Sequence, residues 1–346
     1  MNIKLILDIE QFRKIKEDWV TLFNLAEYSV FQSFEFNFAS WQIDLSRNKQ
    51  NQLSIILLKK NNDSYAVLPL YIDSSKRLRF INDSHSDFCD FISSGFFDVP
   101  KVLAFLKEKI YFSSVKLTNI KIESNVYKSV VSSKILNKVL TSKYEYSTLD
   151  IDKGVFPYNV PFYRSHEKHR INKAIKKHKD KKACILDHRK DAFPKEEILY
   201  LRHRMINLGF RKYNFLTDQR LLLIEYLYNS GFLIIHSMTQ KDTLVACNFI
   251  LKREDNKFLF WIDLFDDIQM INISSYIAFM KSVSLQYPVF IDFGRGRYFY
   301  KTSNFKPTFS RLYQIDIFFT RWTRLNFIFW SKITSFLLSI YRKKKR

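Results

Sequence analysis

The sequence predicts an α+β protein with two domains, each a mixed, mostly antiparallel sheet flanked by helices. Short apolar runs bounded by turn residues follow one another as hairpins, and longer segments with helical periodicity lie between them. The chain has 346 residues, which suits two domains of about 150 residues each. A stretch with one glycine and two prolines, residues 153–162, marks a linker near its middle.

The first predicted domain, residues 1–152, mixes hairpins with crossovers. Its expected strands are residues 2–8, 53–59, 65–71, 77–81, 115–122 and 144–149, and its expected helices are residues 9–25, 34–44 and 99–112. The run Asn61-Asn62-Asp63 separates two apolar strands and is typical of a hairpin turn. Trp19 lies in the first of these helices, whose amphipathic pattern gives it one face for a core.

The second predicted domain, residues 163–320, opens with a basic helix and continues as β, α, α, β, β, β, α, β and a final strand. The expected helices are residues 164–182, 195–208, 217–230 and 274–285, and the expected strands are residues 184–187, 232–238, 244–251, 258–264, 288–292 and 310–318. Gly209 and Gly231 are typical stop signals for the two middle helices. Three successive strands with short polar turns predict a meander in a mostly antiparallel sheet.

The formal net charge of +22 predicts an anionic partner. Nucleic acid, an acidic membrane face and a phosphate-bearing cofactor or substrate all fit. Residues 164–182 hold nine Lys or Arg and three His, while Ile171, Ala174 and Ile175 fall on one helical face. We therefore expect a helix docked by that face and basic elsewhere. Its charge either grips phosphates or is simply solvated.

The segment 321–346 is predicted to be a basic amphipathic tail. Residues 325–341 are mostly apolar but include Lys332, and the chain ends in RKKKR. One interpretation is a helix lying on an anionic membrane surface. The other is a last helix packed on the domain, with a frayed basic end.

Cysteine usage and the start of the chain predict a cytoplasmic protein, either free or peripheral on the inner membrane face. Cys89, Cys184 and Cys247 have no CxxC spacing, which fits a reducing compartment and neither a disulfide framework nor a zinc site. The first apolar run is too short for a signal peptide. His166 and His169 have helical spacing but no further ligand, so we expect no metal.

The segment 288–312 has the strongest local indication of a site. An apolar strand ends at Asp292, and Gly294 and Gly296 follow, two of the six glycines in the chain. Glycine lets the backbone turn sharply or approach a ligand closely. Tyr300 and Lys301 come directly after this turn. From these residues alone, a site and an ordinary surface turn are equally good interpretations.

These features resemble the GNAT acyltransferase superfamily, and most closely its CelD-type (cellulose and exopolysaccharide biosynthesis) acetyltransferases, which are related to Fem-type aminoacyl transferases. The matching residues are Trp19, Phe31-Gln32-Ser33 and Trp41; residues 86–91; Arg164, Lys168 and Arg170 with Arg204 and Gly209; and Asp292-Phe293-Gly294-Arg295-Gly296 with Tyr300-Lys301. The last group, a DFGRG…YK pattern, is the most specific. The resemblance implies two tandem GNAT-like domains, a C-terminal catalytic half and an acyl-thioester donor, typically acetyl-CoA.

Acyl transfer needs a route for the acceptor's proton and stabilisation of an oxyanion, and the resemblance implies candidates for both. For the proton we expect Asp292 first, with Asp263 and Asp266 next. Tyr300 is a candidate donor to the oxyanion or the leaving thiolate, and Lys301 a candidate to neutralise negative charge. The candidates for binding substrate are Arg164, Lys168, Arg170, Arg204 and Asp87.

The donor site departs from the usual GNAT pattern. Residues 266–275 contain no glycine, whereas the pyrophosphate loop of the superfamily is glycine-rich. Phosphate is still expected on backbone amides where a helix starts at Ser274 and Ser275, because helix N-termini attract anions. Gly294, Arg295 and Gly296 are the other candidates for binding the donor. The expected function is acyl transfer from acetyl-CoA or another acyl-CoA to an amine or hydroxyl of a sugar or cell-envelope precursor.

Two alternatives stay open. A Fem-like enzyme would take its acyl group from an aminoacyl-tRNA and use the basic helix to hold the RNA. A non-catalytic GNAT-like or nucleic-acid-binding protein would use the same charge without chemistry, although no RNP-type or zinc-finger motif is present.

Overall fold

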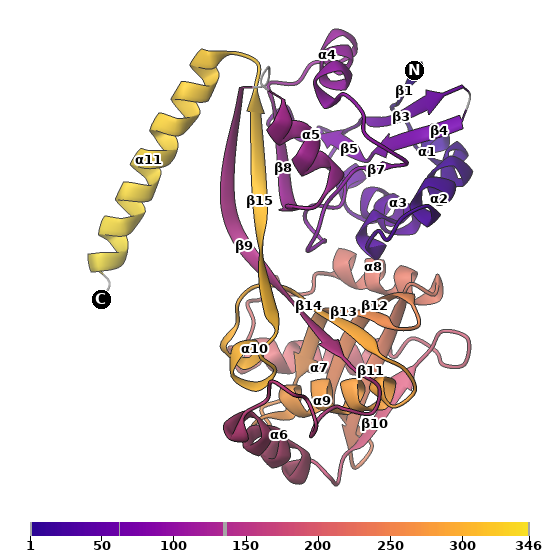
Figure 1. The fold of residues 1–346 in the computed structure, drawn as a ribbon, viewed down its shortest axis with the longest axis vertical. Helices are drawn as coiled ribbons and strands as arrows, with labels where there is room; N and C mark the ends of the chain where they lie inside the picture. The colour runs from indigo at the N-terminus through magenta and orange to yellow at the C-terminus, as the bar shows by residue number, and fades with distance from the viewer. Residues whose placement is uncertain (1, 62, 134–136, 345–346) are drawn as a thin grey trace. The chain divides into compact units, whose positions relative to one another are not determined.

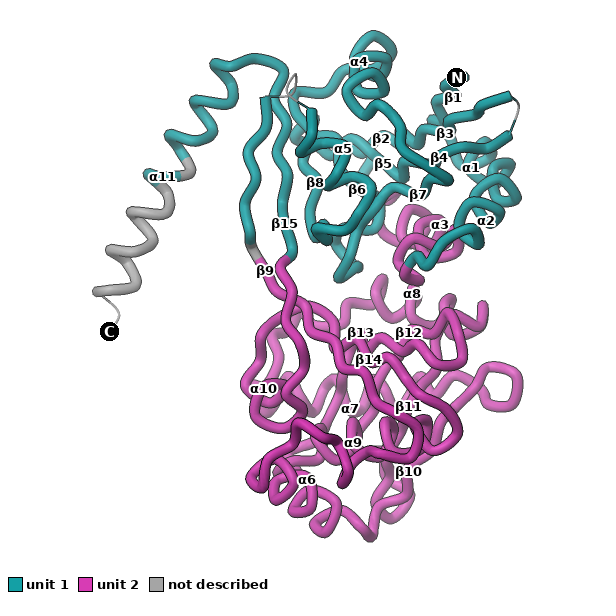
Figure 2. Tube along the Cα trace, viewed as in Figure 1, with its two compact units in different colours: residues 1–28, 48–143, 312–346 teal, residues 29–47, 144–311 magenta. Residues whose placement is uncertain are grey.

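The computed structural model describes residues 2–61, 63–133 and 137–344. The chain forms two compact units, and neither is continuous in sequence (Figure 2). Unit 1 comprises Met1–Tyr28, Asn48–Lys143 and Leu312–Arg346, and unit 2 comprises Ser29–Arg47 and Tyr144–Arg311. The predicted linker at 153–162 therefore falls inside unit 2. Asn62 of the predicted hairpin turn, and Lys345 and Arg346 of the basic tail, lie outside the described residues.

Unit 1 contains a four-stranded sheet in the order β1-β3-β4-β7 and a set of strands in the order β15-β8-β6-β5-β2 (Figure 1). The strands are β1 (Asn2–Ile6), β2 (Gln52–Leu53), β3 (Ile55–Lys60), β4 (Asp63–Leu68), β5 (Leu70–Ile72), β6 (Arg77–Phe80), β7 (Ile92–Ser93), β8 (Ser114–Lys121) and, for its C-terminal part, β15 (Thr308–Phe318). The helices are α1 (Ile9–Lys14), α2 (Lys16–Asn24), α4 (Val99–Lys109), α5 (Asn125–Ser132) and α11 (Arg321–Lys344). The predicted hairpin is confirmed as the antiparallel pair β3–β4.

Two helix predictions for unit 1 need correction, and the single strand expected over residues 65–71 is divided into β4 and β5, which belong to different sheets. The expected helix over 9–25 is divided at Ile15, whose amide bonds back to the carbonyl of Phe12 in α1 while its own carbonyl accepts from Trp19 in α2. Phe12 and Trp19 stack with their ring centroids 5.6 Å apart, so one apolar face continues across the break. Because the spacing of apolar residues continues across Ile15, the sequence pattern gives no sign of the helix break there. Helix α5 was not predicted at all.

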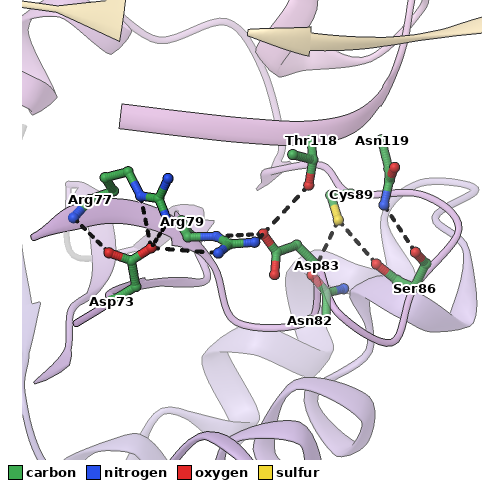
Figure 3. A network of polar contacts seen from close by, with 9 residues as sticks. All are labelled: Asp73, Arg77, Arg79, Asn82, Asp83, Ser86, Cys89, Thr118 and Asn119. Carbon is green, nitrogen blue, oxygen red and sulfur yellow. Dashed lines mark hydrogen bonds and ion pairs between the residues drawn. The ribbon is translucent and has the colours of Figure 1, made fainter. Parts of the chain in front are cut away.

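The acidic loop after β6 is fixed by a buried polar network (Figure 3). Asp83, whose side chain is 1% exposed, accepts from Arg79 Nε and Nη2 at 2.9 and 2.7 Å. Asn119 Nδ2 donates to the Ser86 carbonyl at 3.1 Å. Buried charges need such pairing, because burial alone disfavours the charged form. This loop, which also carries the partly exposed Asp87, is therefore anchored by contacts within unit 1.

Unit 2 is built on strands in the order β10-β11-β12-β13-β14-β9. They are β9 (Asn137–Ile151, its N-terminal part in unit 1), β10 (Lys182–Leu186), β11 (Leu233–Gln240), β12 (Thr243–Glu254), β13 (Lys257–Phe265) and β14 (Val289–Arg295). The helices are α3 (Phe34–Ile43), α6 (Ser165–Lys177), α7 (Lys195–Asn207), α8 (Asp218–Asn229), α9 (Ile271–Ser284) and α10 (Phe299–Asn304). Strands β10–β11, β11–β12, β12–β13 and β14–β9 pair antiparallel and β13–β14 pair in parallel, so the predicted α+β class is confirmed.

Helix α6 docks as its pattern predicts, with Ile171 and Ala174 fully buried. Glu167 on the same helix is also buried and pairs with Lys306 Nζ at 2.8 Å and with the Arg164 backbone amide at 2.9 Å. Burial opposes ionisation of this carboxyl, but these bonds outweigh it and lower the pKa of Glu167. The basic helix is thereby tied to the segment that follows α10.

Candidate active site

The candidate active site lies where β13 and β14 part. The two strands pair in parallel over Lys257–Leu259 and Phe290–Asp292, and both continue beyond that register. Asp263 is on the continuation of β13, opposite Asn248 of β12. Its side chain is 19% exposed, and its Oδ1 lies 3.5 Å from Nη2 of Arg211, in the loop between α7 and α8. The site thus begins as a carboxylate with a surface opening and a neighbouring guanidinium.

Two tyrosines lie near enough to this carboxylate for its charge to act on their hydroxyls. Tyr276 comes from α9 and Tyr300 from α10, and their hydroxyl oxygens are 3.2 Å apart. Their rings stack at a centroid distance of 5.6 Å, and the ring of Tyr298 stacks on Tyr300 at 6.1 Å. Three elements far apart in the chain therefore place two hydrogen-bonded phenols within electrostatic reach of one acid.

The electrostatics suit an acid–base pair. Burial raises the pKa of Asp263, and the charges of Arg211 and Lys301 partly oppose this. Burial, and next the charge of Asp263, raise the pKa of Tyr276 and of Tyr300. Both phenols therefore stay protonated at neutral pH and can donate hydrogen bonds. Since the phenols keep their protons, the ionised carboxylate of Asp263 is the group that can accept one. Its raised pKa makes it a stronger base than an ordinary aspartate.

Lys301 is turned inward. It is 1% exposed, and its Nζ donates to the carbonyl oxygens of Phe293 at 2.6 Å and Gly296 at 3.1 Å, with those of Gly294 and Arg295 at 3.4 and 3.5 Å. An ammonium surrounded by carbonyl oxygens fixes the backbone path between β14 and α10. Lys301 thus positions Tyr300 through its hydrogen bonds to the main chain and adds positive charge near Asp263.

Asp292, the first sequence candidate for the proton route, has a local structural contact. It is 4% exposed, and its Oδ1 accepts from the backbone amide of Gly294 at 2.7 Å. A carboxylate that accepts from the amide two residues on is a turn-forming contact. We therefore place Asp263 ahead of Asp292 as the candidate base.

The glycines of the DFGRG stretch serve the turn. Gly294 and Gly296 have φ angles of +67° and +103°, which L side chains rarely adopt. A Cβ on Gly296 would lie 2.5 Å from the ring of Tyr298. The guanidinium of Arg295 lies 4.9 Å from the Tyr144 ring. These contacts shape the backbone around Tyr298 and Tyr300, and the proposed contact with a donor remains a prediction.

Ser274 and Ser275 face the protein interior. Helix α9 starts at Ile271, three residues before the predicted start, so both serines lie inside its first turns. Ser274 Oγ donates to the Ala174 carbonyl at 3.1 Å, and Ser275 Oγ bonds to Asn248 and lies 3.0 Å from His236 Nδ1. Their side chains are thus committed to packing α9 on α6 and on the sheet.

His236 is a buried core histidine on β11. It is 2% exposed, and burial lowers its pKa to about 4.

The predicted substrate-binding residues are dispersed. Arg204 on α7 forms an ion pair with Asp266, which follows β13. Arg170 on α6 lies over the ring of Phe299, 5.7 Å from its centroid. Arg164 precedes α6 and Lys168 lies on it, while Asp87 belongs to unit 1. Within unit 2, the basic helix therefore reaches α10, and Lys177 at its other end donates to Gln269 beside the start of α9 at 2.8 Å.

Arg211 and Tyr276 are the site residues that the sequence did not reveal. Tyr276 lies in the apolar run YIAFM and has the pattern of a core residue. Arg211 follows the helix-stopping Gly209 in GFRKYNF, a basic and aromatic loop, which was the available signal. Its partner Asp263 is 52 positions away, so no local pattern connects them.

No protein-family model matches this sequence, and no curated protein is detectably similar to it. Solved structures do match. The C-terminal (DUF2156) domain of a protein assigned as a lysylphosphatidylglycerol synthetase from Agrobacterium fabrum has a TM-score of 0.59 at 8% identity, over 92% of this chain and 95% of that one. FemX has a TM-score of 0.55 at 9% identity, over 91% and 97%. A tandem GNAT protein from the clavulanic acid biosynthesis pathway has 0.50 at 7%, over 91% and 98%.

At these identities the matches establish the fold. They extend over nine-tenths of the chain, and one of the matching proteins is itself a tandem GNAT protein. The nearer resemblance to CelD-type acetyltransferases is not among these findings and stays a prediction. The chain therefore has the α+β fold of two tandem GNAT-like domains.

Proposed function

We propose that this protein is an acyltransferase whose reaction takes place at Asp263, Tyr276 and Tyr300. The observation that carries the proposal is a pair of hydrogen-bonded phenols within electrostatic reach of a raised-pKa carboxylate, where β13 and β14 part. Acyl transfer needs a proton acceptor and a hydrogen-bond donor at the same carbonyl. The tandem GNAT-like fold supports the same reaction class.

In the proposed reaction, Asp263 takes a proton from an amine or hydroxyl of the acceptor. The freed electron pair forms a bond to the thioester carbonyl carbon. A tyrosine hydroxyl donates to the oxyanion of the tetrahedral intermediate, and collapse breaks the carbon–sulfur bond. The leaving thiolate takes a proton from the tyrosine pair, which recovers it from Asp263. The acceptor's proton thus ends on sulfur, and no further reactant is needed.

The donor that we propose is acetyl-CoA or another acyl-CoA, and the proposed acceptor is a sugar or cell-envelope precursor. Phosphates of the donor would meet the basic end of α6, where Lys177 reaches Gln269. A second candidate is a Fem-like transfer from aminoacyl-tRNA. It is favoured by the exposed ring of Phe299, 76% exposed beside Arg170, because such a pair can stack a single-stranded base.

A thermal-shift titration tests the donor class. A ligand at 100 times its Kd adds about 2.7 kcal/mol to the free energy of unfolding. We expect acetyl-CoA to raise Tm saturably by a few degrees. Lys177→Gln should weaken that shift, and Lys49→Gln, an exposed substitution elsewhere in the chain, should not. A shift with aminoacyl-tRNA and none with any acyl-CoA would move the assignment to the second candidate.

We further propose that α11 attaches the protein to an anionic membrane surface. Trp322, Leu325 and Phe329 recur with helical spacing and are 70%, 58% and 59% exposed. Arg321 and Arg324 lie on the same helix. Exposed aromatics beside cations favour the interface of an anionic bilayer. Among the described helices, none is long and apolar enough to span a membrane.

Vesicle cosedimentation checks this attachment. We expect binding to vesicles of phosphatidylglycerol and phosphatidylcholine, weaker binding to phosphatidylcholine alone, and a loss with added salt. The double variant Trp322→Ser/Phe329→Ser should lose at least tenfold in affinity, because two large apolar side chains no longer insert. Leu25→Ser removes a side chain that is 63% exposed elsewhere and is the control. Equal binding by both variants would contradict a role for α11.

A further inference from the structure

Arg211 has hydrogen-bonding capacity that the protein does not use. Its contact with Asp263 is a single one, at 3.5 Å, the outer limit of a hydrogen bond. Its Nε is buried and has no hydrogen-bond partner. The guanidinium lies 4.8 Å from the ring of Phe215, and its side chain is 37% exposed. The group is thus held in place by stacking and by one weak contact.

Two other arginines of the chain show what a satisfied guanidinium looks like here, although Arg202 also has a buried Nε without a hydrogen-bond partner. Arg79 uses Nε and Nη2 on Asp83 at 2.9 and 2.7 Å. Arg189 uses Nε and Nη2 on Asp187 at 3.0 and 2.7 Å. Both therefore offer the two-pronged edge that fits an oxyanion. On Arg211 the corresponding Nε has no hydrogen-bond partner. Leaving this buried donor unpaired costs free energy unless a ligand accepts a hydrogen bond from it.

We propose that Arg211 is a binding subsite for an anionic group on the acceptor, a carboxylate or a phosphate that accepts two N–H bonds. This inference rests on the proposed function for the role of Asp263 but not for the binding of the anion itself. Since Arg211 adjoins the candidate base, the acceptor would carry its nucleophile and its anion on neighbouring parts of one molecule. An amino acid or a phosphorylated sugar has that chemistry.

The surroundings of Arg211 fit an acceptor entrance. Phe210 packs on Phe265 at a centroid distance of 5.8 Å and remains 41% exposed. Tyr213 is 83% exposed in the same loop. The charge of Arg211 also lowers the pKa of Tyr276 and Tyr300 against the effect of burial, so it is electrostatically part of the site. A bound anion would therefore sit between an aromatic loop and the reacting groups.

The test is a titration with inorganic phosphate and, separately, with acetate at constant ionic strength, followed by Tm. We expect saturable stabilisation of the wild type by at least one of them. Arg211→Met should weaken this affinity about tenfold, since a charge-assisted pair of bonds is lost. Lys212→Met removes the same charge from the next residue and should change the affinity less than twofold. Asp263→Asn should tighten binding, because it removes the competing carboxylate.

Equal weakening by Arg211→Met and Lys212→Met would overturn the subsite and indicate general attraction to a basic surface. No saturable shift with either anion would overturn it too. A response to phosphate alone identifies a phosphorylated acceptor, and a response to acetate alone a carboxylate.

A titration of Arg211→Met with acetyl-CoA separates this inference from the proposed function. An unchanged acetyl-CoA shift supports a role toward the acceptor. Its loss only in Arg211→Met would assign Arg211 to the donor and overturn the inference. Absence of an acetyl-CoA shift in the wild type would count against the proposed donor and leave the anion result standing.

Discussion

Replacing Asp263 with asparagine is expected to lower kcat by about a hundredfold to ten-thousandfold and to leave the fold intact. The amide keeps the shape of the side chain but cannot take a proton from the acceptor. Because burial raises the pKa of Asp263, the wild-type rate should fall on the acid side as this group is protonated, and should rise with pH through its pKa. The measurement is kcat across a pH series, with circular dichroism as the check on folding.

Asp292→Asn is the matched comparison for this prediction. Its Oδ1 can still accept from the amide of Gly294, so the turn should persist and kcat should change little. Asp255→Asn, in the exposed turn between β12 and β13, is the neutral control. The reverse pattern, with a large loss for Asp292→Asn and a normal rate for Asp263→Asn, would return the role of base to the residue that the sequence favoured.

Replacing Lys301 with methionine is expected to lower the free energy of unfolding by about 3 kcal/mol or more, because buried carbonyls lose a charged donor. The side chain is almost fully buried, and its ammonium bonds the carbonyls of Phe293 and Gly296. Urea denaturation measures this loss. Lys281→Met, on the exposed side of α9, should change stability by less than about 0.5 kcal/mol.

The same variant distinguishes a positioning residue from a group that contacts substrate. The positive charge of Lys301 opposes the raised pKa of Asp263, so its removal should move the acid limb of the rate profile to higher pH. If Lys301 instead touched the substrate, kcat would fall, while the free energy of unfolding and the pH of the acid limb would both stay unchanged. That outcome would contradict the interpretation of Lys301 as a positioning residue.

Periodicity predicted most of the fold. The meander of β11, β12 and β13 follows its apolar pattern closely, and helix α6 does so up to Lys177, five residues before its predicted end. Two short helices, α5 and α10, were not predicted. The six residues of α10 have no room for a helical repeat of apolar positions, and they follow a turn that dominates the local pattern. The allocation of residues 29–47 to unit 2 depends on contacts such as α3 with α8, which no local signal encodes.

The residues that the structure groups in the candidate site were foreseen in part, and their roles stay predictions. Asp263, Tyr300 and Lys301 do come together, but the direction of Lys301 could not be foreseen, since lysine is rarely buried and its pattern favours solvent. Tyr276 has the pattern of a core residue and is one, with its hydroxyl at the site. What remained hidden were contacts between distant segments, above all the loop carrying Arg211 and the end of β13.

The division of the chain between its units has a consequence for biosynthesis. Strand β15 pairs with β8, with Leu312 opposite Lys121, so the sheet of unit 1 is completed by a strand that is made after strands β10 to β14 of unit 2. Unit 2, ending at Arg311, has all its strands earlier in translation. Domains generally fold as units during synthesis, N-terminal ones first. Here unit 1 begins before unit 2 but is completed after it, and nascent unit 1 keeps an open sheet edge until β15 has been made.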